Sequence, residues 1–284
     1  MFHPALISNL EKSFERDSIR RTDLAKRASS KLFRWHPSKG ALVSAIAGLI
    51  VLALSVAMIP ARDMRWIGIL LRDIGMIFLV GILFPLLFIH RSRSSFAEFG
   101  LTFKRWYIFS PINLALGGLL LFLFISETPP VDFQFDVSTG SKVVYILLAG
   151  MFEVVFFYGF QRTLFERAFG IVPGIFLAAL FYSFHHAGFQ PEFGKLFFVG
   201  VMYASVFRIG NSVFLIYPFF WGVGGCYDVL VQSQSVSTIM YPGIRSLYLG
   251  VLILAAVIWI GKDRKRVKMQ SRGKAYENEN NHPL

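Results

Sequence analysis

Residues Met151 to Gly188 read MFEVVFFYGFQRTLFERAFGIVPGIFLAALFYSFHHAG and carry the strongest signals in this chain. Two apolar segments meet there at a short basic turn. The first segment carries one carboxylate, Glu153, and the second ends in the adjacent pair His185 and His186. Ionisable side chains are costly at membrane depth and usually serve a function there, so these three residues are candidate site residues.

The composition predicts an all-α, polytopic transmembrane helical bundle. Of 284 residues, 55% are hydrophobic and only 16% are charged, and the mean hydropathy is +0.55. Long apolar runs favour helices over a barrel, whose strands would alternate over about ten residues. The single cysteine, Cys226, excludes an internal disulfide and a thiolate metal cluster. The net charge of +12 lies mostly in tails and short loops, which indicates contact with anionic lipids and not with nucleic acid.

Because a spanning helix needs about 20 residues, we predict eight spans. Since the sixth and seventh are short, seven spans plus a re-entrant piece is the alternative. Arg72 and Asp73 fall inside the second span; either they pair within the bundle, or 62–73 lies at the interface and the span begins near Ile74, which we expect. The predicted spans are 41–60, 67–89, 106–125, 142–160, 171–189, 194–209, 212–231 and 246–261.

One transmembrane domain, 41–261, is expected between two basic cytoplasmic tails, 1–40 and 262–284. The first tail has no apolar core of signal-peptide length, and its apolar spacing allows either an interfacial helix or a solvated segment. Eight spans put both termini on one side, and most basic residues fall on that side, as the positive-inside rule predicts. We expect an integral protein of the cytoplasmic (inner) membrane of a prokaryote.

The predicted depths allow Glu153 and His185 to meet. Glu153 lies about 16 Å inside the outer end of the fourth span, and His185 about 9 Å from the outer face, a difference that boundary errors could remove. A carboxylate beside an imidazole suits a general base near neutral pH, and a water between them could be deprotonated for attack on a peptide bond. The structural alternative is a Glu and His that pair across helices only to satisfy each other.

The segments EVVFFYG and FYSFH resemble the first two motifs of the CPBP (CAAX protease and bacteriocin-processing, or Abi) family of intramembrane proteases. The motif Glu matches Glu153, and the second motif, FxxxH, matches Phe181 and His185. Phe157 and Gly159 match residues that commonly accompany the first motif. The resemblance covers a CPBP-like core, 142–231. It implies a glutamate-dependent peptidase in which Glu153 activates water and His185 assists.

Four positions depart from the family pattern. The second Glu of the first motif is Val154, and its Arg is Tyr158; the His and Asn of the third motif fall on Phe220 and Gly224. An active site without its second His lacks an oxyanion or water partner. The resemblance therefore also fits a catalytically degenerate member that acts as a membrane scaffold or peptide-binding protein.

Four residues are possible supporting groups on helical spacing: Tyr158, Arg162, His186 and Asp228. Arg162 lies four residues after Tyr158 and could approach the acid, although a positive-inside anchor is the simpler reading. Asp228 shares a stripe with Phe220 and Gly224, or marks a helix end. His186 points about 100° away from His185 and is expected to be a packing or interface residue.

We predict no cofactor. A divalent metal is the less favoured alternative because a catalytic zinc site needs three protein ligands, and a third could be chosen only by assumption. The expected function is cleavage of a lipidated, leader-bearing or C-terminally anchored peptide at the membrane. A proton-coupled transporter would require discontinuous spans or internal symmetry, and the sequence offers neither.

Overall fold

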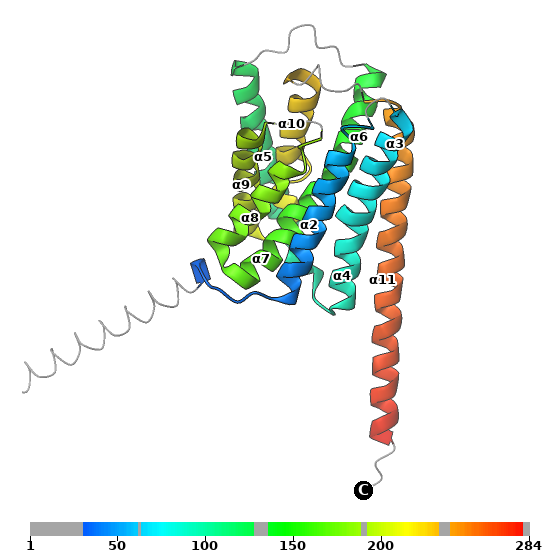
Figure 1. Ribbon diagram of the computed structural model, residues 1–284. Coiled ribbons are helices and arrows are strands. Elements are labelled where there is room, and N and C mark those ends of the chain that lie inside the picture. The colour runs from blue at the N-terminus through cyan, green and yellow to red at the C-terminus, as the bar shows by residue number, and fades with distance from the viewer. Residues whose placement is uncertain (1–30, 62–63, 128–135, 189–191, 233–238, 281–284) are drawn as a thin grey trace, which may run out of the picture.

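The computed structural model describes residues 31–61, 64–127, 136–188, 192–232 and 239–280. Every regular element within these ranges is a helix, as predicted (Figure 1). The interfacial helix considered for the N-terminal tail falls almost wholly outside the described residues.

Several α and π segments follow one another without a break, as in α3–η1–α4, α6–η3–α7 and α10–η5. The elements in chain order are α2 (Lys39–Ala57), α3 (Arg65–Ile69), η1 (Leu70–Leu83), α4 (Phe84–Arg91), η2 (Phe96–Phe99), α5 (Trp106–Glu127), α6 (Val137–Glu153), η3 (Val154–Gln161), α7 (Arg162–Phe169), α8 (Ile171–Phe184), α9 (Phe193–Gly210), η4 (Val213–Leu215), α10 (Phe219–Tyr227), η5 (Asp228–Gln232) and α11 (Pro242–Asn280).

Six helices in the described ranges are long and apolar enough to cross a membrane. They are Lys39–Ala57, Trp66–Arg91, Trp106–Glu127, Val137–Phe169, Phe193–Gly210 and Pro242–Arg264. Two shorter apolar helices, Ile171–Phe184 and Phe219–Val231, correspond to the fifth and seventh predicted spans. A helix of 14 residues is about 21 Å long and falls short of a hydrocarbon core of about 30 Å.

Several predicted boundaries are wrong. The fourth span was expected at 142–160, but its helix runs from Val137 to Phe169, because the basic turn after Gln161 stays helical as α7. The fifth was expected to reach 189, but α8 ends at Phe184. The last span, expected at 246–261, agrees within four residues with the apolar helix Pro242–Arg264, although α11 itself continues to Asn280.

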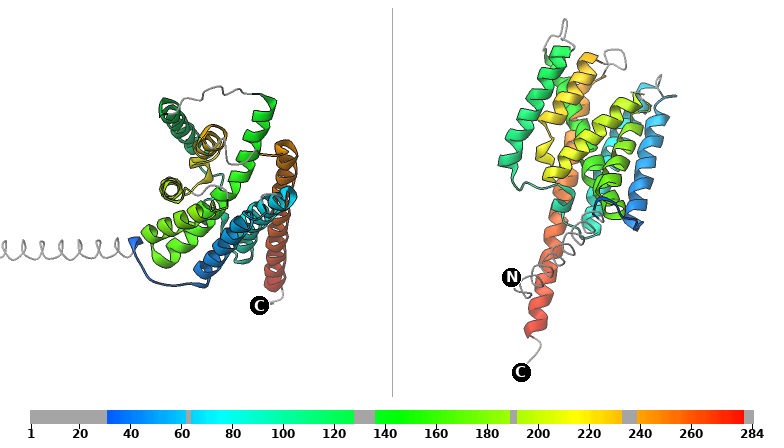
Figure 2. Two further views of the ribbon diagram at one scale, coloured as in Figure 1. Left: turned by 45° about the horizontal axis from the view of Figure 1, so that its top comes forward. Right: turned by 90° about the vertical axis from the view of Figure 1, so that its left-hand side faces the viewer.

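The continuous helix α6–η3–α7 passes through the bundle, and other elements pack on its sides (Figures 1 and 2). On one side, α11 packs along α6 and η1. On the other, α10 packs along α5 and α6, while α8 packs between α7 and α9. The start of α2 and the extended end of α11 lie at the same end of the bundle (Figure 1).

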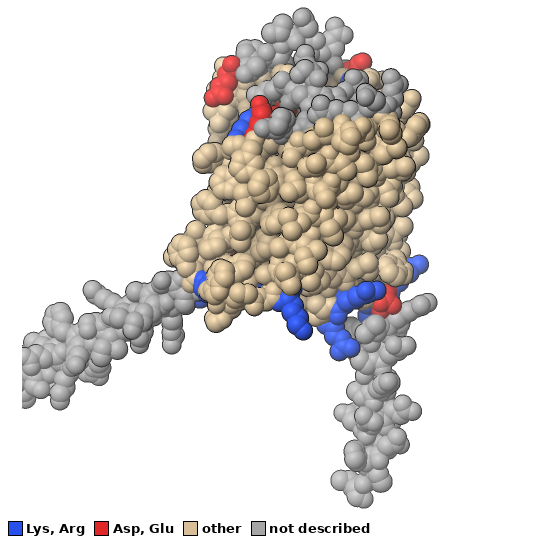
Figure 3. Space-filling view, viewed as in Figure 1, with Lys and Arg blue, Asp and Glu red and all other residues tan. Residues whose placement is uncertain are grey.

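Charged side chains of the described residues gather at the two ends of the bundle. Lys and Arg lie mainly at the end from which α11 extends, and a wide uncharged belt separates them from acidic residues at the other end (Figure 3). This distribution is typical of a protein whose middle faces lipid.

The connection between α4 and α5 is an ordered, capped turn at the basic end. The backbone N–H of Ser95 donates to Glu98 at 3.0 Å, and Arg167 reaches the same carboxylate at 2.6 Å. The Ser95 hydrogen bond and the Arg167 charge hold the pKa of Glu98 below its usual range. Gly100 follows with φ of 73°, a left-handed conformation that favours glycine.

A buried ion pair joins η1 to α11. Asp73 is fully buried, and its two oxygens accept from Arg245 at 2.7 and 2.6 Å. The hydroxyl of Tyr145 donates to the same carboxylate at 2.8 Å, and that of Tyr248 also contacts it. The expectation that 62–73 lies at the interface is therefore wrong for Asp73, because Arg245 and two phenols provide its partners inside the bundle.

We expect Asp73→Asn to destabilise the protein by about 3–5 kcal/mol, because it leaves the Arg245 charge buried without its counter-ion. The melting temperature of the purified protein in detergent measures the loss. The control is Arg167→Gln, which breaks a pair with side chains 40% and 49% exposed and should cost at most about 1 kcal/mol. Equal losses in the two variants would contradict a stabilising role for the Asp73–Arg245 pair.

Candidate functional site

A cavity of about 310 Å³ lies between α6, the end of α8, α9 and α10. Its wall includes Glu153, His185 and His186, and also Trp221. Arg72, Lys195 and Asp228 line it as well, so both signs of charge border an otherwise largely apolar space. The volume exceeds that of several water molecules, each of which takes about 30 Å³ in the liquid.

The two histidines lie where α8 stops, inside the bundle. His185 is the C-cap of α8, and the chain from His185 to Gly188 forms turns. The hydrogen bonds of the last turn are of the tighter 3-10 type, from His186 N–H to the Ser183 oxygen and from Ala187 N–H to the Phe184 oxygen. Both imidazoles turn Nδ1 to the same carbonyl, that of Tyr182. Their ring centroids are 3.8 Å apart. The prediction that His186 points away as a packing or interface residue is wrong.

One backbone carbonyl fixes both rings. The oxygen of Tyr182 lies 2.5 Å from Nδ1 of His185 and 3.0 Å from Nδ1 of His186. Since a carbonyl can only accept, each ring carries a proton on Nδ1 and donates it to Tyr182. This tautomer directs Nε2 of each ring to the opposite side, where Glu153 lies.

The predicted proximity of Glu153 and His185 is confirmed. Oε1 of Glu153 is 3.3 Å from Nε2 of His185 and 3.9 Å from Nε2 of His186. The Glu153 side chain is 12% exposed, and those of His185 and His186 are 1% and 7% exposed. Three titratable groups thus meet at one point beside the cavity.

Trp221 is a site residue that the sequence motifs did not predict. Its indole Nε1–H donates to Oε2 of Glu153 at 3.0 Å, on the side opposite the histidines. Gly150 makes room for this ring, because a Cβ there would come within 1.7 Å of Trp221. Gly150 precedes Glu153 by three residues and therefore shares its helix face, which was the available signal.

A close contact with α2 anchors the turn that carries the histidines. The backbone N–H of Gly188 donates to the hydroxyl of Ser55 at 3.0 Å. A Cβ at Gly188 would lie 1.8 Å from the backbone oxygen of Ser55, so only glycine permits this approach. The anchor holds the end of α8 at the depth of Glu153.

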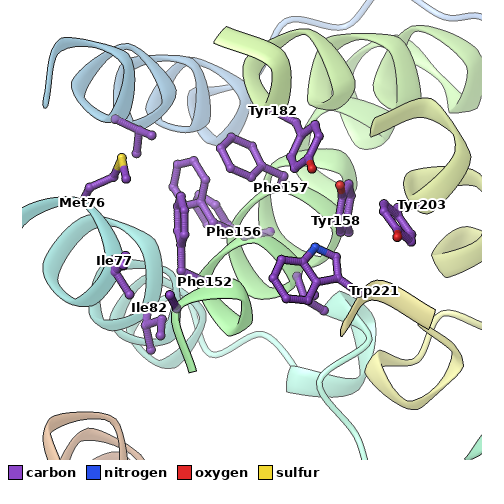
Figure 4. Packing of buried hydrophobic residues seen from close by; sticks show 14 of the residues in the cluster. Met76, Ile77, Ile82, Phe152, Phe156, Phe157, Tyr158, Tyr182, Tyr203 and Trp221 are labelled. Carbon is purple, nitrogen blue, oxygen red and sulfur yellow. The ribbon is translucent and has the colours of Figure 1, made fainter. Parts of the chain in front are cut away.

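Aromatic rings pack closely around the site. Phe157 lies 4.8 Å and Phe152 5.3 Å from the His185 ring, by centroids. Figure 4 shows Tyr158 between Tyr182 and Tyr203, with Trp221 nearby. The centroid of the Tyr158 ring is 5.6 Å from that of Tyr182 and 5.9 Å from that of Tyr203. These buried rings restrict the rotamers of the polar groups among them.

Arg162 was a possible partner of Glu153, but its described hydrogen bonds go to other groups. It is 1% exposed and donates to Glu166 at 2.6 Å and to Asn211 at 3.0 Å. Its Nε donates to the backbone oxygen of Tyr158 at 2.7 Å. Arg162 is therefore neither an exposed basic anchor nor, in its described contacts, a partner of Glu153.

Asp228 lines the cavity and is the C-cap of α10, and the chain continues from it as η5 to Gln232. Its carboxylate accepts from Lys195 at 3.0 Å, which links α9 to the start of η5.

The positions aligned with the third family motif carry no hydrogen-bonding side chain. Phe220 packs 5.0 Å from the Tyr203 ring by centroids, and a Cβ at Gly224 would lie 2.3 Å from the Tyr203 hydroxyl.

The residues at the site could hold a metal ion. Glu153, His185 and His186 each offer one ligand atom, and these atoms all lie within 4.8 Å of one another. His186 is thus the residue whose position would allow it to be the third ligand. Two imidazoles and one carboxylate are a ligand set used by catalytic zinc sites.

Comparison of the chain with protein-family models, with curated proteins and with solved structures gives no match. The resemblance to the CPBP family rests on the motif residues alone and stays a prediction.

We expect Gly150→Ala to displace the Trp221 indole and destabilise the protein by about 1–3 kcal/mol, as overpacking does. The melting temperature in detergent measures the loss. Gly118→Ala is the matched control, because a Cβ at Gly118 meets nothing within 4 Å. If both variants melt at the wild-type temperature, the close packing of Trp221 on Gly150 is wrong.

Proposed function

We propose that this chain is an intramembrane endopeptidase of the CPBP type that uses Glu153 to activate water with His185 assisting. One observation carries the proposal: Oε1 of Glu153 lies 3.3 Å from Nε2 of His185 at the wall of a cavity of about 310 Å³. The substrate is a membrane-associated peptide that is lipidated, leader-bearing or C-terminally anchored.

In this mechanism, a single water molecule donates two hydrogen bonds, one to the Glu153 carboxylate and one to Nε2 of His185. The Nδ1–H bond of His185 to Tyr182 supports this role, because it leaves the Nε2 lone pair to accept. The carboxylate takes a proton as the water oxygen attacks the peptide carbonyl, and returns it to the leaving amine. The Trp221 indole donates to the other carboxylate oxygen and keeps Glu153 oriented.

The proposal extends to the membrane. Eight membrane segments, two of them short, would leave both termini on the basic side, and the positive-inside rule makes that side cytoplasmic. The basic tails would contact anionic lipids there. We propose the cytoplasmic (inner) membrane of a prokaryote as the location.

A second candidate is a catalytically degenerate member that binds a membrane peptide without cutting it. Its specific support is the chemistry of the positions that depart from the family motifs. Val154, Tyr158 and Phe220 are buried, and each lacks the charge or imidazole that the family carries there.

Glu153→Gln and His185→Ala should each abolish peptide processing, because the first removes the base and the second its water partner. The measurement compares membrane-peptide termini by mass spectrometry in host cells that carry each variant, where uncleaved precursors should accumulate. Glu127→Gln and His90→Ala are matched controls outside the cavity and should process normally. Normal processing in both site variants, with normal membrane insertion, would contradict the peptidase and leave the peptide-binding candidate.

Trp221→Phe should lower kcat/KM about 10-fold, because a hydrogen bond to a charged group is worth about 1.5–3 kcal/mol and a factor of ten is about 1.4 kcal/mol. Phenylalanine keeps much of the ring packing and removes the donor. The control is Trp259→Phe on α11, where the tryptophan is 57% exposed. Cleavage rates with the purified protein decide the matter, and an unchanged kcat/KM in Trp221→Phe would exclude an orienting role.

A further inference from the structure

The cavity of about 310 Å³ lies toward one end of the bundle. Its lining residues fall at 72–77 on the helix Trp66–Arg91, at 120–124 on α5 and at 195–203 on α9. Each set is centred in the half of its helix that is farther from the basic end, from which α11 extends (Figure 1). Ile239, just before the start of α11, also lines the cavity. We call this farther end of the bundle the acidic end.

The early stop of α8 leaves space on that side of the site. α8 follows α7 after Gly170, at the basic end, and its 14 residues extend about 21 Å along the helix axis. A helix of that length leaves about 9 Å of a hydrocarbon core of about 30 Å unfilled beyond His185. The cavity lies at the depth that α8 does not reach.

Packed side chains close the basic side of the site. The helix α6–η3–α7 runs from the acidic end to the basic end, so η3 lies on the basic side of Glu153. All eight residues of η3 are buried. Arg162 comes next in the chain, is 1% exposed and is held by Glu166 and Asn211. Because protein interiors contain few voids larger than a water molecule, this layer blocks a path for a peptide from the basic end.

The cavity reaches the surface toward the acidic end. Lys195 lines it near the start of α9, and the Lys195 side chain is 47% exposed. Asp228, which accepts from Lys195 at 3.0 Å, also lines the cavity and is 19% exposed. A lysine side chain that is half exposed and part of the wall marks the place where the cavity meets water.

We propose that the Glu153–His185 site is entered from the acidic end, and that its substrate is a peptide segment on the outer side of the membrane. The positive-inside rule makes the basic end cytoplasmic, so the acidic end faces away from the cytoplasm. Export of the substrate, or of the segment that is cut, must then precede cleavage. This inference deepens the proposed function and rests on it for the substrate, whereas the direction of entry follows from the residues around the cavity.

Cysteine accessibility measures the side of entry without any substrate. Single-cysteine variants Lys195→Cys, Val199→Cys and Lys104→Cys are made in a Cys226→Ser background. Spheroplasts and inside-out vesicles of the host cells are treated with a small charged methanethiosulfonate that does not cross membranes. Val199 lines the cavity about one helical turn deeper than Lys195, and Lys104 is exposed in the connection before α5, at the basic end.

Lys195→Cys and Val199→Cys should react in spheroplasts, and Lys104→Cys only in inside-out vesicles. Phe198→Cys is the control for depth, because Phe198 precedes Val199 and is 73% exposed on the outside of the bundle. Since the thiolate is the reactive form and needs water, Val199→Cys should react at least about 10-fold faster than Phe198→Cys. The melting temperature of each purified variant checks that it folds.

Peptide termini identify the side of the substrate. Cells with the wild-type protein should contain new termini in exported segments that cells with Glu153→Gln lack. Mass spectrometry of the spheroplast medium, the membranes and the cytosol compares the two strains.

Labelling of Val199→Cys only in inside-out vesicles, or at the rate of Phe198→Cys in spheroplasts, would overturn entry from the acidic end. Labelling of Lys104→Cys in spheroplasts would overturn the orientation, and with it the exported substrate. Glu153-dependent termini in cytoplasmic segments would overturn the exported substrate and leave the peptidase intact. Labelling of Val199→Cys from outside, in cells without Glu153-dependent cleavage, would support the direction of entry and count against the peptidase.

Discussion

A carboxylate buried in a membrane protein must have partners, and the environment of Glu153 follows from that constraint. Burying an unpaired charge is very unfavourable, so buried charges are paired, hydrogen-bonded or bound to metals. Glu153 has an indole donor on one oxygen and two imidazoles near the other. Asp73 meets the same constraint differently, through Arg245 and two phenols. Asp73 has full cationic compensation from Arg245, whereas Glu153 faces nitrogen atoms that can bind a proton or a metal.

Helix α8 provides those nitrogens because it ends early. Irregular backbone at membrane depth is tolerated where it is buried in protein or lines a cavity, and the turn from His185 to Gly188 does both. Close contacts at Gly188 and Gly150 bring α2 and Trp221 to the site. The π-helix η3 starts directly after Glu153, and such segments often occur at functional sites.

Sequence patterns predicted the fold class and the meeting of Glu153 with His185, because hydropathy and the cost of buried charge are local properties. They failed where the outcome depends on where a helix stops. The apolar run through 171–189 gives no stop signal at Phe184, so His186 was assigned to the wrong face. Trp221 and Arg245 were missed since each meets its partner, Glu153 or Asp73, only through tertiary packing. The catalytic roles and the CPBP resemblance stay predictions.

The central claim is that Glu153 and both histidines converge at one point inside the membrane. A high-resolution density map of the protein in a lipid nanodisc tests it most directly. We expect Oε1 of Glu153 within about 4 Å of both Nε2 atoms, the range over which a shared water or ion connects them. A carboxylate more than about 8 Å from either imidazole, beyond the reach of one bridging water, would contradict the claim.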